Sequence, residues 1–155
     1  MLLLIIHCMM LVNISNRTSP NKDEAGHIAG GLMIWQYGRY DLYCVNPPLV
    51  RLIASYPITV AGLEEDWCAL RYDPINRPEF SRGLQLMQKH PERHRFFLRL
   101  GRWACLPISL LGGYLCYKWV LHAVNQYAAF TALSLWAFSP AMLAHAGSIS
   151  PDALA

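Results

Sequence analysis

Two adjacent carboxylates, Asp23 and Glu24, stand at the start of a predicted helix and are followed by His27. One face of that helix carries four residues at i, i+3, i+4 and i+7: Asp23, Gly26, His27 and Gly30. A carboxylate beside a histidine suits a general base, and the glycines would let a bound molecule approach closely. The structural alternative is simpler, because the helix dipole alone favours acidic residues in a first turn.

Metal and disulfide chemistry have weaker signals. Glu24 and His27 have the i, i+3 spacing of a helical metal-binding pair, but no further ligand is evident, so a divalent metal is a minor alternative and no cofactor is expected. The five cysteines show no CxxC spacing. Cys44 and Cys68 lie in a charged region and could pair if that region faces an oxidising compartment.

The segments that position these side chains can be recognised from the uneven distribution of charge along the chain. Of the 155 residues, 54% are hydrophobic and 15% are charged. Between Arg17 and Arg102 lie 12 of the 13 Lys and Arg residues, and 9 of the 10 acids lie between Asp23 and Glu92. A short apolar start, a charged middle and a long apolar end are typical of an integral membrane protein. The net charge of +3 is modest and spread out, so nucleic acid is not an expected partner.

The apolar segments predict an all-α membrane protein. Residues 1–12 are too short to span a bilayer and are interpreted as a partial first transmembrane helix, with a cleaved signal peptide as the alternative. Residues 101–121 and 126–147 are predicted to form transmembrane helices two and three, an antiparallel hairpin with a kink at Pro140. Residues 148–155 would begin a second external loop. Because both ends are apolar, we expect the chain to be a fragment of a larger membrane protein.

The segment 13–100 is long for a structureless loop and should contain helices of its own. Hydrophobic periodicity predicts one helix over about 23–37, ending at Gly38, and a second over about 47–60. Both are expected to be amphipathic juxtamembrane helices that lie along the membrane surface. A third, short helix is expected near Ser81 to Lys89.

Three stretches resemble a known family: "DEAGHIAGGLMIWQYGRYDLYCVNPPLVRLIASYPI", "LRLGRWACLPISLLGGYLCYKWV" and "ALSLWAFSPAMLAHAGSISPDALA". In this order they resemble the N-terminal third of bacterial GT-C glycosyltransferases, which include protein O-mannosyltransferases and aminoarabinose transferases. The resemblance implies transfer of a sugar from a polyprenyl-phosphate carrier to an acceptor glycan, lipid or protein. It also implies a bacterial inner-membrane location, with residues 13–100 on the extracytoplasmic side.

The resemblance also implies roles for individual residues. Asp23 matches the family's presumed general base, Glu24 is its paired neighbour, and Asp152 matches an acidic residue that lines the same cavity. Arg51 and Arg102 are candidate ligands of the lipid phosphate; the alternative for both is an interface anchor or a surface salt bridge, and it is favoured for Arg102. Two histidines complete the expected substrate-binding set, His27 and His145, each with a packed structural histidine as the alternative.

A chain of this length has at most three spans, so we expect it to be inactive by itself. The second functional hypothesis is a non-catalytic membrane protein whose loop helices bind a lipid or protein partner. The two hypotheses differ at Asp23, because only the first requires an ionised carboxylate there.

Overall fold

The computed structural model describes residues 1–66 and 77–153. This part of the chain is all-helical, with seven α-helices, one 3-10 helix and no strand. The helices are α1 (Leu2–Arg17), α2 (Lys22–Tyr37), α3 (Leu49–Val60), α4 (Pro78–Lys89), α5 (His94–Ala123), α6 (Gln126–Phe138), α7 (Pro140–Ala146) and η1 (Pro151–Ala153). The predicted all-α class is therefore confirmed for the described residues.

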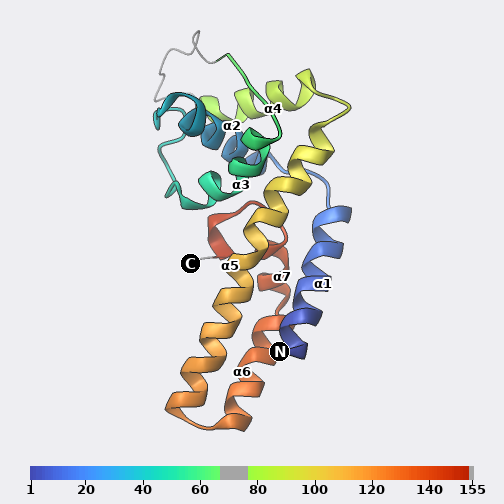
Figure 1. The fold of residues 1–155 in the computed structure, drawn as a ribbon, viewed down its shortest axis with the longest axis vertical. Coiled ribbons are helices and arrows are strands. Elements are labelled where there is room, and N and C mark those ends of the chain that lie inside the picture. The colour runs from blue at the N-terminus through green and yellow to red at the C-terminus, as the bar shows by residue number, and fades with distance from the viewer. Residues whose placement is uncertain (67–76, 154–155) are drawn as a thin grey trace.

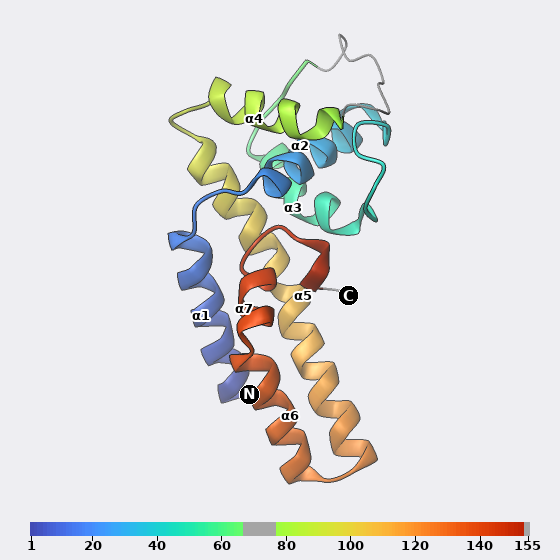
Figure 2. The same ribbon diagram turned by 180° about the vertical axis from the view of Figure 1, so that it is seen from behind.

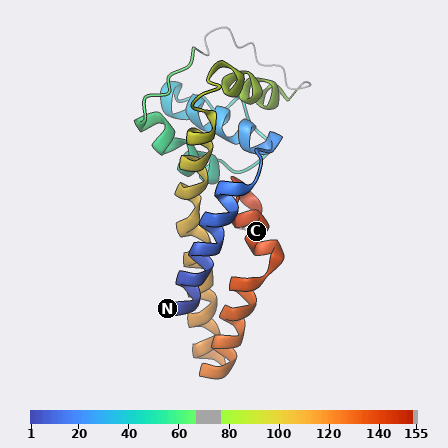
Figure 3. The ribbon, with the colours of Figure 1, turned by 90° about the vertical axis from the view of Figure 1, so that its right-hand side faces the viewer.

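The helices form two parts, a head and a stalk. The head consists of α2, α3 and α4, which gather at one end of the molecule (Figure 1). The stalk consists of α1, α5, α6 and α7, with α5 running from the head to the far end and α6 returning antiparallel to it (Figures 2 and 3). This arrangement brings the chain segment after α7 back to the underside of the head.

Local signals at both ends explain why α2 forms where the sequence predicts it. The Asn21 side chain accepts a hydrogen bond from the Glu24 N–H at 2.8 Å, and the Glu24 carboxylate accepts one from the Asn21 N–H at 3.1 Å. This reciprocal capping box satisfies two backbone donors at the helix start. Gly38 ends the helix in the left-handed conformation, with φ of 67°.

The prediction that α2 is an amphipathic surface helix is wrong. All its residues from Glu24 to Ile34 are buried, because α3 and α4 pack on it. The glycines leave room for the protein's own side chains: a Cβ on Gly26 would meet Phe80 at 3.2 Å, and one on Gly30 would meet Tyr43 at 3.0 Å. The glycine face therefore serves helix packing and not the approach of a ligand.

The other two head helices follow the sequence more closely. α3 begins directly after Pro48, close to the predicted start at residue 47, and exposes the apolar side chains of Leu49, Tyr56 and Val60. α4 begins at Pro78, slightly before the predicted start at Ser81. Gly83 of α4 lies against the backbone of Ala25, where an added Cβ would come within 2.3 Å, so only glycine permits this approach.

The helix α5 is, within the described residues, the single helix long and apolar enough to cross a membrane by itself. It begins at His94 instead of residue 101, and its first two turns carry Arg95 and Arg99 outward while Phe97 and Leu98 pack into the core of the head. Only 22% of its apolar window is buried within the protein, so most of that surface faces outward. Length and composition allow up to three spans if each of two bent helix pairs counts as one.

Those bent pairs modify the predicted first and third spans. α1 continues to Arg17, beyond residue 12, and meets α2 at 97°. The predicted helix 126–147 is divided into α6 and α7, which meet at 55°. Pro140 begins α7, and the Ser139 hydroxyl accepts a hydrogen bond from the Met142 N–H at 3.4 Å. The proline therefore produces a full break with a new helix cap.

Side chains from three helices hold the stalk together around this break. His7 of α1 donates through Nδ1 to the Ala137 carbonyl at 2.9 Å, and its Nε2 lies 3.0 Å from the Ser109 hydroxyl of α5. The Trp136 ring packs against Gly112 and Gly113, where small residues let α5 and α6 approach closely. These contacts fix the end of α6 against α1 and α5, and therefore the point from which α7 runs toward the head.

Candidate active site

A buried ion pair lies where the head meets the stalk. The Arg102 guanidinium of α5 donates through Nε and Nη2 to the two carboxylate oxygens of Glu24, each at 2.7 Å. Both side chains are almost completely buried, with 2% and 0% of their surface exposed. Such a two-point pair fixes both the distance and the orientation of the two groups.

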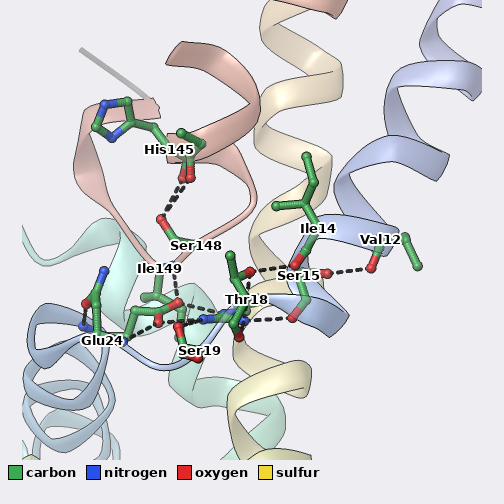
Figure 4. Close-up of polar contacts among 12 residues, drawn as sticks. Val12, Ile14, Ser15, Thr18, Ser19, Glu24, His145, Ser148 and Ile149 are labelled. Carbon is green, nitrogen blue, oxygen red and sulfur yellow. Dashed lines mark hydrogen bonds and ion pairs between the residues drawn. The ribbon is translucent and has the colours of Figure 1, made fainter. Parts of the chain in front are cut away.

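Further hydrogen bonds extend the pair into a network (Figure 4). The remaining Arg102 donors bind backbone carbonyls at the end of α1 and in the following linker, at Ser15, Thr18 and Ser19. Glu24 also accepts the Ile149 N–H at 3.1 Å. One ion pair thus joins α2 and α5 to the α1–α2 linker and to the segment that leads to Asp152.

This network corrects two roles expected from the sequence. Because all the N–H groups of Arg102 are engaged within the protein, the geometry does not support Arg102 as a ligand of a lipid phosphate. Glu24 uses its carboxylate for Arg102, Ile149 and the helix cap, so it has a structural role in place of the expected catalytic one.

His27 lies at the centre of the candidate site. Its side chain is 1% exposed, and its ring stacks on Tyr43 with centroids 4.8 Å apart. Its Nδ1 has no hydrogen-bond partner among the described residues. Burial, together with the charge of Arg51, lowers the pKa of His27 from 6.5 to about 4.

The two predicted carboxylates Asp23 and Asp152 both act on His27 through their charge. Each is close enough for its negative charge to raise the pKa of His27, against the effect of burial. Both side chains are exposed. The segment that leads to Asp152 reaches the start of α2, because the Ile149 N–H binds Glu24 at 3.1 Å. The structure therefore places Asp23 and Asp152 on neighbouring segments near His27, and their action in one site stays a prediction.

The carboxylates differ in their surroundings. Asp23 has no hydrogen bond or ion pair with a described residue, so its oxygens remain open to solvent. Asp152 accepts a hydrogen bond from Ser150 Oγ at 2.6 Å, and its Oδ2 lies 3.5 Å from Nδ1 of His145. His145 is half exposed and therefore belongs to the rim of the site instead of being packed in the stalk.

Arg51 is buried against Tyr43 and stabilises the loop that carries it. It is 1% exposed, and its guanidinium carbon lies 4.2 Å from the centroid of the Tyr43 ring. Two of its nitrogens donate to the backbone carbonyls of Tyr43 and Asn46, while Nε has no partner among the described residues. The expected role as a phosphate ligand is not supported, because Arg51 instead holds the loop that carries Tyr43.

Two residues of the site had no signal in the sequence analysis. Tyr43 lies in the loop between α2 and α3, where no periodicity marks buried positions. Arg77 precedes α4, lies 4.3 Å above the Phe80 ring and pairs with Glu79 at 2.7 Å. The pair with Glu79 raises the pKa of Arg77, and Asp23 adds to this effect, so an exposed cation lies near the open carboxylate.

The metal and disulfide hypotheses gain no support. In residues 1–66 and 77–153 no group of three or more His, Cys, Asp and Glu side chains could hold a metal ion. Cys44 is exposed, and its predicted partner Cys68 lies outside the described residues.

No known protein family, no curated protein and no solved structure matches this chain. The case for a function therefore depends on the geometry of the site and on the chemistry of its residues.

Proposed function

We propose that this chain supplies the carboxylates of a membrane glycosyltransferase that moves a sugar from a polyprenyl-phosphate carrier to an extracytoplasmic acceptor. The observation that carries the proposal is the contact of Ile149 with Glu24 at 3.1 Å, which brings the segment with exposed Asp152 to the helix start with exposed Asp23. In this proposal the stalk lies in the inner membrane of a bacterium and the head faces outward.

Asp23 is the general base of the proposed reaction. Its unbonded, exposed carboxylate can take the proton from an acceptor hydroxyl or phosphate as that oxygen attacks the anomeric carbon of the sugar. The bond from the anomeric carbon to the carrier phosphate breaks, and its electron pair leaves with the phosphate. A charged phosphate leaving group needs a cation more than a proton donor, and Arg77 is the exposed cation near Asp23.

Two buried polar atoms next to Tyr43 have no hydrogen-bond partner among the described residues. A buried polar atom without a hydrogen bond costs about 1–3 kcal/mol, so such atoms are uncommon unless water or a ligand satisfies them. His27 Nδ1 and Arg51 Nε are two such atoms, and both belong to side chains that contact Tyr43.

A test of the proposal replaces Asp23 by Asn at the native gene, so that the protein keeps its own membrane and partners. We expect transfer of a radiolabelled sugar from polyprenyl phosphate to the membrane acceptor to fall by about 100-fold or more, the usual contribution of a positioned base. The exposed Glu64→Gln variant is the matched control and should transfer at the normal rate. Undiminished transfer by Asp23→Asn, at equal protein level, would rule out Asp23 as the base.

A second candidate function is a non-catalytic membrane protein that binds a lipid or protein partner through its head. The exposed apolar face of α3 favours this second function. Tyr56 and Val60 of this face are exposed, and the ring centroid of Tyr56 lies 5.3 Å from that of exposed Trp35. A face of this kind is suited to the boundary between lipid headgroups and acyl chains. This function requires no charge at Asp23 or Asp152, so the same transfer assay separates the two candidates.

A further inference from the structure

A pocket of about 170 Å³ lies on the stalk side of the Glu24–Arg102 pair. It is formed by the end of α1, the linker to α2 and the first turns of α5, and four arginines line it: Arg17, Arg95, Arg99 and Arg102. None of the residues of the proposed sugar-transfer site lines this pocket. Whatever it binds is therefore independent of the proposed function.

The charge of this pocket is not balanced within the protein. Arg102 is neutralised by Glu24, but Arg17, Arg95 and Arg99 are exposed and form no ion pair with a described residue. Among the described residues that line the pocket, none is acidic. Arg95 and Arg99 also lie one helical turn apart, where two like charges destabilise a helix slightly. Three unpaired arginines around one cavity form a site that favours an anion.

The shape and polarity of the site favour a phosphate group. A guanidinium presents paired N–H donors in a planar fork that matches two phosphate oxygens, so several arginines can share one phosphate. Ser19 in the linker adds a hydroxyl, and buried Leu98 lies between the arginines of α5 as an apolar wall. The cavity of about 170 Å³ has room for a phosphate with its ester substituent.

The position along α5 indicates where such a phosphate would come from. The apolar part of α5 begins just after Arg102 with Trp103, which is 44% exposed. Arginines followed by an exposed tryptophan are typical of the height at which lipid headgroups meet the acyl region.

We propose that Arg17, Arg95 and Arg99 form a binding site for a phosphate group. Its source is either the headgroup of an anionic phospholipid or a free phosphate compound, and both offer the same charged oxygens to the arginines. The Glu24–Arg102 pair gives the site its rigidity, because Arg102 binds the Ser15 carbonyl at 2.7 Å and so fixes the end of α1 against α5.

The test uses the full chain in nonionic detergent and measures its thermal unfolding midpoint during two titrations. One titration adds inorganic phosphate, and the other adds phosphatidylglycerol to the micelles, with phosphatidylcholine as the zwitterionic comparison. A ligand that binds only the folded protein raises the midpoint with concentration. Stabilisation by phosphate alone identifies a site for free phosphate compounds, and stabilisation by phosphatidylglycerol alone identifies a headgroup site. Either result supports the proposal when the arginine variants below weaken it.

Arg95→Gln and Arg99→Gln should each raise the apparent dissociation constant about tenfold, because each removes one charge-assisted contact. Both side chains are exposed, so these variants should unfold at the normal temperature without ligand. Arg82→Gln removes an equal charge from α4, where Arg82 binds Gln85 outside the pocket, and should bind within twofold of the wild type. The proposal fails if neither ligand stabilises the protein, if both pocket variants bind normally, or if Arg82→Gln weakens binding equally.

Discussion

The variant Glu24→Gln should lower the free energy of unfolding by about 3–5 kcal/mol, the usual cost of removing one partner from a buried ion pair. The substitution keeps the size of the side chain and an oxygen that can still cap α2, so it removes mainly the charge. Arg102 would then keep its positive charge in a place that is 2% exposed, with no carboxylate to balance it. Reversible unfolding of the full chain in mixed micelles measures the loss.

A double-mutant cycle with Arg102→Met separates the pair from its surroundings. Arg102→Met alone leaves the Glu24 charge buried without a partner and should be as damaging as Glu24→Gln. The double variant removes both charges, so its loss should be smaller than the sum of the two single losses. As a control, exposed Glu64→Gln should change stability by less than about 0.5 kcal/mol. Equal small effects for Glu24→Gln and Glu64→Gln would contradict the structural role of the pair.

The protein should also lose stability in mild acid because of His27. The pKa of His27 is about 4 in the folded protein, below its ordinary value of 6.5, so the unfolded chain binds this proton more readily. The corresponding stability is fully present above pH 6.5 and is lost as the pH falls toward 4. The total loss from this one group is on the order of 3 kcal/mol.

The measurement compares the pH dependence of unfolding in the wild type with that of His27→Gln, whose side chain does not titrate. Between pH 6.5 and pH 4 the wild type should lose stability more steeply than the variant. The other ionisable groups near His27 are the same in both proteins: Asp23, Asp152, Glu24, Tyr43 and Arg51. The difference between the two curves therefore reports on the imidazole alone. His122→Gln, at an exposed histidine, should follow the wild type. Parallel curves for wild type and His27→Gln would contradict the burial of this ring.

Local features of the chain were predictable because their causes lie within a few residues. The start of α2 follows from Asn21 and Glu24, its end from Gly38, and the start of α3 from the prolines before it. The break at Pro140 also has a local cause, although the sequence predicted a kink where the structure has two helices. Hydropathy located the apolar part of α5 but missed its first two turns, since His94, Arg95 and Arg99 lower the mean hydropathy there.

The long-range features had no such signal. Nothing in the sequence links Glu24 with Arg102, and periodicity alone suggested that the glycines of α2 made room for a ligand. In the structure Phe80 and Tyr43 occupy that room, because α4 and the loop after α2 pack on this face. Only the resemblance suggested that Asp152 returns to Asp23; in the structure Ile149, three residues before Asp152, binds Glu24, the neighbour of Asp23.

The central claim is that Asp23 and Asp152 act together in one sugar-transfer site. Its most direct test measures sugar transfer in native membranes that contain Asp23→Asn, Asp152→Asn or both substitutions at the native gene. Groups that act as one unit give non-additive losses, so we expect each single variant to be strongly impaired and the double variant to be little worse than Asp23→Asn. Normal transfer by Asp152→Asn, or a double variant whose loss equals the product of the two single losses, would contradict the claim.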